Sequence, residues 1–196
     1  MGMRARKVLA VTVVAGVVLA GCGKSGGASS SGSTGETAAV SAKTYVSKIC
    51  GAMNTWQQAI KKRVDNLNAS LSPTDTVDQR KQALATYLDN LVSDTGNLVQ
   101  SAKAAGAPDV SGGETAANRI DTAFQQVENA LQDARDKVDA LPTNVTAFQN
   151  AVQQLSNDIT DSTTKIGDSL NTLTQGDLDS AFNDNPTCQK IASFGG

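Results

Sequence analysis

The stretch that decides the fold is NRIDTAFQQVENALQDARDKVDAL, residues 118–141. Its apolar residues recur at spacings of three and four, the period of an amphipathic α-helix with one buried face. They are Ile120, Phe124, Val127, Leu131, Ala134, Val138 and Leu141. No alternation of apolar and polar residues typical of a half-buried strand interrupts them. This stretch predicts a long helix packed against other elements.

The same period extends outward over nearly the whole chain from residue 41 to residue 173. Before the deciding stretch, it predicts one helix over about 41–71 and a second that opens after Ser72-Pro73 and runs to about residue 105. After the stretch, it predicts a fourth helix over about 145–173, followed by a short helical turn at Asp177–Phe182. The fold class is therefore all-α.

Breaks between these segments are marked by residues that stop helices or cap them. Gly106-Ala107-Pro108 supplies a glycine followed by a residue that cannot continue a helix. Ser41 is placed to cap the first helix, and Ser111 to Glu114 has the spacing of a capping box for the third. Leu141-Pro142-Thr143 ends the third helix and offers Thr143 as a cap for the fourth. Short connections between long helices favour an antiparallel up-down-up-down four-helix bundle.

The amino-terminal residues have the layout of a secretory signal peptide. Arg4, Arg6 and Lys7 precede thirteen uncharged residues, Val8 to Ala20. The run ends in Leu19-Ala20-Gly21-Cys22, which resembles the lipobox of bacterial lipoproteins. That resemblance implies cleavage after residue 21, a lipid on Cys22, and a location at the extracytoplasmic face of the cell membrane. The alternative is an ordinary secretory signal with a chance cysteine.

Composition divides the remainder into a tether and one domain. Residues 22–39 are dominated by Gly, Ser, Thr and Ala, which is typical of a flexible linker. Residues 40–196 form the predicted bundle domain. Removal of residues 1–21 leaves 14 basic and 19 acidic residues, a net charge of −5. This mildly acidic domain gives no electrostatic reason to bind nucleic acid.

With Cys22 committed to lipid, Cys50 and Cys188 remain, and two thiols of an exported domain usually pair. In an antiparallel bundle of four helices, the start of the first helix and the end of the fourth lie at the same end. The predicted topology therefore brings the two cysteines together. Such a bridge would contribute about 4–5 kcal/mol at most by chain entropy. Two separate buried thiols are the alternative.

The chain contains no histidine. It therefore lacks the commonest general base and metal ligand, and we assign no catalytic residue, metal site or cofactor. Aspartates such as Asp133, Asp136 and Asp158 occupy polar phases of the helices, where a solvated surface is the simpler interpretation. We expect the chain not to be an enzyme.

One group of residues suggests a pocket. Small and polar residues interrupt the apolar stripes of the predicted helices. Counting residues from the helix ends places these interruptions at a common level of the bundle, near the expected disulfide. They are Gly51, Thr95, Gly96, Ala117, Asp121, Thr163 and Gly167. Glycine within a helix often has a packing or functional reason. Close helix packing and simple solvent exposure are the alternatives to a pocket.

Two functions follow from these features. The first is a non-enzymatic cell-envelope lipoprotein whose bundle binds an envelope protein or a cell-wall component, anchored to the membrane through Cys22. The second is a carrier or sensor of a small ligand held between the helices, which would require a cavity of several hundred Å³. The sequence defines neither the partner nor the oligomeric state.

Overall fold

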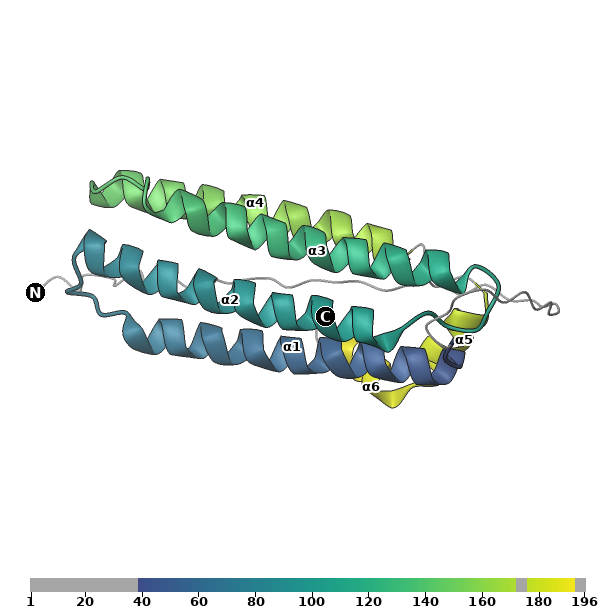
Figure 1. The fold of residues 1–196 in the computed structure, drawn as a ribbon. Coiled ribbons are helices and arrows are strands. Elements are labelled where there is room, and N and C mark those ends of the chain that lie inside the picture. Colours follow the sequence, from purple (N-terminus) through teal and green to yellow (C-terminus); the bar gives the residue numbers. More distant parts are fainter. Residues whose placement is uncertain (1–38, 172–175, 193–196) are drawn as a thin grey trace, which may run out of the picture.

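The computed structural model describes residues 39–171 and 176–192, with side chains given for all of these except 160, 162–171 and 192. The predicted signal peptide, Cys22 and nearly all of the linker therefore lie outside the described residues. The described part is helical, and its four long helices run antiparallel, which confirms the predicted fold class (Figure 1). The helices are α1 (Ala42–Ser70), α2 (Val77–Ala105), α3 (Gly113–Val138), α4 (Val145–Asn171), α5 (Asp177–Asn183) and α6 (Pro186–Ala192).

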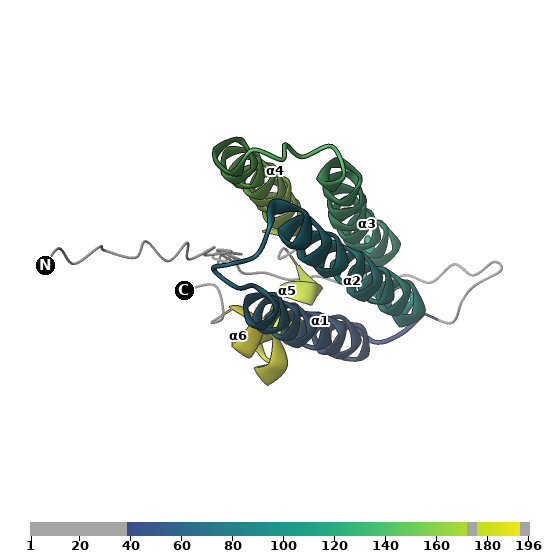
Figure 2. The ribbon, with the colours of Figure 1, turned by 90° about the vertical axis from the view of Figure 1, so that its left-hand side faces the viewer.

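The long helices do not close into a ring, because no extensive contact joins α1 to α4 in the described part. Figure 2 shows α2 in the middle, with α1 on one side of it and α3 and α4 on the other. In the described part, α2 packs extensively against α1 and α3, and α4 packs chiefly on α3. The further neighbours of α1 are α5 and α6. These short helices therefore cover part of α1, and the disulfide joins α6 to it.

Two hydrophobic clusters fill the described interior. The first lies at the end where α1 begins, and joins α1, α2 and α3 to Leu178, Ala181 and Ile191 of the short helices. The second lies toward the opposite end and joins Leu88 and Leu91 of α2 to α3 and α4. The partly buried Trp56 packs against both clusters.

The helix starts confirm one predicted cap, move one predicted helix start and correct two predicted caps. Ser41 caps α1, since its side chain accepts a hydrogen bond from Thr44 N at 3.2 Å. The second helix starts later than predicted, because Ser72 and Asp75 bond to each other in a turn, and Thr76 forms a capping box with Gln79.

The predicted capping box at Ser111–Glu114 is wrong. Gly112, with φ 73°, occupies the N-cap position of α3 and supplies no side-chain hydrogen bond. The predicted cap Thr143 is also wrong, because the Oδ1 atom of Asn144 accepts the hydrogen bond from Ala147 N at 3.1 Å. Each error is a shift of one residue along its own loop, so the predicted helix boundaries stay nearly right.

The carboxyl-terminal segment contains two short helices, whereas the sequence pattern predicts one. The expected turn at Asp177–Phe182 is confirmed as α5. Helix α6 was missed, although Asn185 and Pro186 form a recognisable start signal: Asn185 Oδ1 accepts from Thr187 N and Cys188 N, and Pro186 is the first helical residue.

Cys50 and Cys188 form a disulfide, with their Cα atoms 5.2 Å apart. The predicted pairing is therefore confirmed. The bond joins α1 directly to α6, and both cysteines are buried in the first cluster.

Candidate functional site

The chain joins the bundle at Val40, beside the loop between α2 and α3. Val40 N donates to Ala107 O at 3.0 Å, and Asp109 N donates to Val40 O at 2.7 Å. The same loop passes close to Gly113, where an added Cβ would lie 1.9 Å from Pro108 O. The described chain therefore enters the bundle at its disulfide end.

The structure does not gather the described members of the predicted pocket in one environment. Thr95 is fully buried, and Ala117 is buried in the first cluster. At Gly51, an added Cβ would have no described heavy atom within 4 Å. Gly96 faces Glu128, whose Oε1 would lie 3.0 Å from an added Cβ. Thr163 and Gly167 lie outside the side chains that the structure describes.

Thr95 has a structural partner at the level where the pocket was expected. Its Oγ1 accepts a hydrogen bond from Trp56 Nε1 at 2.9 Å, which joins α1 to α2 between the two hydrophobic clusters. A buried hydroxyl needs such a partner, and an indole N–H can only donate. This pair therefore gives a packing reason for the polar residue in the apolar stripe.

Asp121 lies closer to the disulfide end than Gly96 does. Its partial burial raises the pKa of its carboxyl above the ordinary value, and the charge of Lys103 acts in the opposite direction. Burial and the charge of Asp121 together raise the pKa of Tyr45, on α1, above its usual range. Lys103 and Gly96 are seven residues apart on α2, or about two helical turns. Asp121 and Gly96 thus belong to different levels of the bundle.

Ion pairs join α2 to both α1 and α3. Arg63 of α1 holds Asp94 of α2 through two hydrogen bonds of 2.8 and 3.2 Å. The side chains are only 28% and 14% exposed, so water screens this pair less than a surface pair. The bond to Asp94 also raises the pKa of Arg63. Arg135 of α3 pairs with Asp89 of α2 at 2.8 Å.

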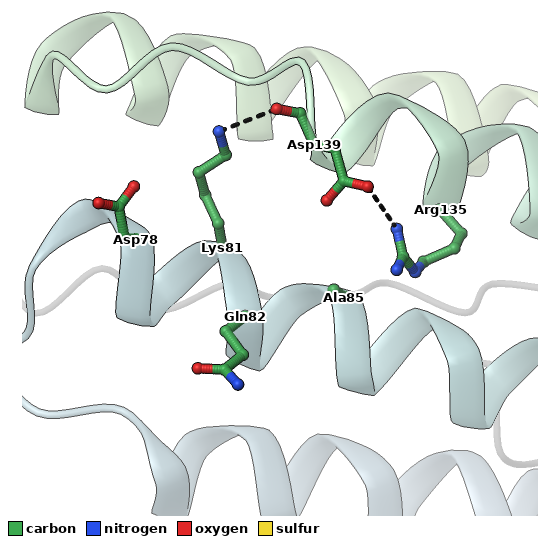
Figure 3. Close-up of a pocket in the computed structure, with 6 residues that line it drawn as sticks. All are labelled: Asp78, Lys81, Gln82, Ala85, Arg135 and Asp139. Carbon is green, nitrogen blue, oxygen red and sulfur yellow. Dashed lines mark hydrogen bonds and ion pairs between the residues drawn. The ribbon is translucent and has the colours of Figure 1, made fainter.

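A shallow depression of about 330 Å³ lies between the start of α2 and the end of α3 (Figure 3). Its lining includes Lys81, Arg135 and Asp139. Lys81 Nζ donates to the carbonyl oxygens of Asp139 at 3.0 Å and Leu141 at 2.8 Å, and Arg135 pairs with Asp139 at 3.5 Å. Both cations therefore bind groups at the end of α3, and the arrangement is that of a helix cap rather than a ligand site.

Two other kinds of feature are absent from the described part of the chain. No group of three or more Cys, Asp or Glu residues there is arranged to hold a metal ion. None of its helices carries an apolar stretch that could cross a membrane.

Comparison of the chain with protein-family models, curated proteins and solved structures finds no match.

Proposed function

We propose that this chain is a non-enzymatic cell-envelope lipoprotein. A lipid on Cys22 anchors it at the extracytoplasmic face of the cell membrane, and its helical bundle binds another envelope protein or a cell-wall component. The motif Leu19-Ala20-Gly21-Cys22, after an uncharged run, supports the anchor. Two acyl chains are needed for stable anchoring, because one chain gives only weak, reversible binding.

The observation that carries this proposal is the attachment of Val40 at one end of the bundle. With the anchor on that side, the disulfide end faces the membrane. The α1–α2 turn and the α3–α4 turn then lie at the opposite end, since α1 alone, with 29 residues, is about 43 Å long. We call these two turns, residues 71–76 and 139–144, together with Val145, the distal tip.

The distal tip carries apolar side chains that the bundle does not bury. Leu71 is 39% exposed and Val145 is 55% exposed. In the described part, these two are the large hydrophobic residues that are exposed. Two side chains do not form a large patch, but they are apolar groups that this end of the bundle offers to a protein or wall surface. The first contact of an anchored bundle with its surroundings would be made here.

The described interior supports an interaction module over a ligand carrier. Trp56 and Thr95 occupy the level at which the pocket was expected, and their polar atoms bond to each other. The polar groups of the depression bind the end of α3. These contacts hold the helices in place, which suits a bundle that acts through its outer surface.

Photo-crosslinking in the native cell envelope tests this function. A photoreactive amino acid at Val145 should yield a discrete adduct with one envelope component. The same group at Glu114, which is exposed at the disulfide end, is the matched control and should not give that adduct. Equal labelling at both positions, or none at Val145, would contradict the proposal. Native mass spectrometry of the extracted protein would reveal a retained small ligand, the result expected of a carrier.

A further inference from the structure

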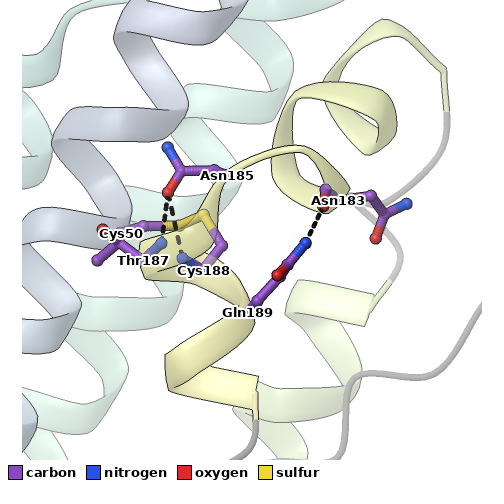
Figure 4. The surroundings of a disulfide bond; sticks show 6 residues. All are labelled: Cys50, Asn183, Asn185, Thr187, Cys188 and Gln189. Atoms are coloured by element: carbon purple, nitrogen blue, oxygen red, sulfur yellow. Dashed lines mark hydrogen bonds between the residues drawn. A yellow bond between two sulfur atoms is a disulfide. The ribbon is translucent and has the colours of Figure 1, made fainter.

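The two short helices form a separate layer on α1. Residues 176–192, which we call the strap, comprise α5 and α6 and the residues joining them. In the described part, their extensive contacts with the bundle are with α1 alone. Figure 4 shows α6 beside α1, with the Cys50–Cys188 bond between them.

The polar contacts described for the strap's amide side chains are internal. Asn185 bonds to Thr187 N and Cys188 N, Gln189 donates to Asn183 O at 2.6 Å, and Asn183 donates to Asp179 at 3.1 Å. None of these bonds reaches α1. The contacts described between the strap and α1 include apolar packing in the first cluster and the disulfide.

The apolar contacts are few for the length of chain that they order. The strap has seventeen residues whose backbone must be fixed when it docks. Its buried residues are Leu178, Ala181, Cys188 and Ile191. Each helix has seven residues, well below the length of about 12–15 at which an isolated helix becomes even marginally stable in water. The strap cannot be expected to keep its structure when it leaves α1.

The disulfide lowers the entropic cost of docking the strap, because it fixes the strap at a second point. The strap follows α4 in the chain, and Cys188 fixes its far end to α1. A segment attached at both ends loses much less conformational freedom when it docks than a segment attached at one end.

The rest of the bundle has contacts that do not involve the strap. The second hydrophobic cluster contains no strap residue. The pairs Arg63–Asp94 and Trp56–Thr95 join α1 to α2 directly, and neither pair includes a strap residue. Loss of the strap would uncover part of α1 around Cys50 and Val46, which lie one turn apart on the same face of the helix and are now buried.

From these contacts we propose that the strap is a conformational device clasped by the Cys50–Cys188 bond. Without the bond, residues 176–192 open as a unit and expose an apolar face of α1, while α1, α2 and α3 stay packed.

Hydrogen exchange followed by mass spectrometry tests the proposal on the full mature chain. In the double variant Cys50→Ala/Cys188→Ala, the amides of α5 and α6 should exchange at the rate of an unstructured peptide. The central amides of α2 and α3 should remain protected. Treatment of the wild type with a dithiol, which is oxidised to its cyclic disulfide as the two thiols form, should give the same pattern.

Leu155→Ala, which removes a buried side chain from the second cluster and keeps the bond, is the matched control. It should leave the strap as protected as in the wild type. Two results would overturn the proposal. One is a strap that stays protected without the bond. The other is simultaneous loss of protection in the strap, α2 and α3, including failure of the double variant to fold.

Discussion

Gly113, the first residue of α3, has the least room for a side chain of the described glycines. An added Cβ would lie 1.9 Å from the backbone oxygen of Pro108, in the loop that also bonds Val40. Gly113→Ala should therefore lower the free energy of unfolding by about 1–3 kcal/mol, the usual scale of overpacking. Urea denaturation measures this change.

Gly51→Ala is the control for that substitution. Gly51 lies within α1, and an added Cβ would meet no described atom within 4 Å. Alanine is a better helix former than glycine by about 1 kcal/mol, so this variant should be neutral or more stable than the wild type. Equal losses in the two variants would contradict the steric explanation.

The hydroxyl of Thr95 can be tested by replacement with a side chain of the same shape. Thr95→Val leaves Trp56 Nε1 without the acceptor that it now has at 2.9 Å. An unsatisfied buried donor costs about 1–3 kcal/mol, and the denaturation midpoint should fall accordingly. An unchanged midpoint would mean that water reaches the indole N–H and that the pair contributes little.

Asp121 makes stability depend on pH in a predictable direction. Folding raises the pKa of its carboxyl above the ordinary value of 3.8, so the unfolded chain gives up the proton more readily. Ionisation of Asp121 therefore lowers stability as the pH rises from 3.8 through the folded-state pKa. Asp121→Asn should raise the melting temperature at neutral pH, and the gain should vanish below pH 3.8. A variant that melts earlier at neutral pH would show that the attraction of Lys103 outweighs burial.

At the level of elements, the hydrophobic period predicted the long helices well, because it reflects burial along a whole face. Ile120, Phe124 and Val127 are all buried as expected. The caps were predicted less well, because several neighbouring polar residues can each accept the same backbone hydrogen bond. Thr143 and Asn144 are such a pair. Only the path of the loop determines that Asn144 accepts the hydrogen bond from Ala147 N. Helix α6 is too short to show a period.

The end of α3 depends on a side chain from another helix. Lys81 Nζ donates to the carbonyl oxygens of Asp139 and Leu141. Lys81→Met keeps the apolar stem and removes both bonds, so stability should fall by about 0.5–1.5 kcal/mol in thermal denaturation.

Lys61→Met is the matched control, because within the described residues Lys61 pairs with the exposed Asp65 four residues later and with no other acid. Exposed pairs of this kind contribute about 0.3–0.5 kcal/mol. If the Lys81 variant were no less stable than the Lys61 variant, the cap would be unimportant for α3.

At the scale of the whole molecule, the sequence predicted which end holds the disulfide but not the register between helices. Counting from the helix ends placed Asp121 level with Gly96, whereas Glu128 faces Gly96 and Asp121 lies near Lys103. Loop lengths and cap positions set this register, and errors of a few residues at each end add up to about two turns. The lack of an extensive contact between α1 and α4 in the described part likewise depends on tertiary packing that no local pattern encodes.

The most direct test of the proposed function is the chemical state of Cys22 in protein isolated from its native envelope. Mass spectrometry of the membrane fraction should find a mature chain that begins at Cys22 and carries a diacylglyceryl group on its sulfur. A Cys22→Ser variant should be lost from that fraction or remain uncleaved. A wild-type chain that begins at another residue, or that carries Cys22 as an unmodified thiol, would contradict the lipoprotein proposal.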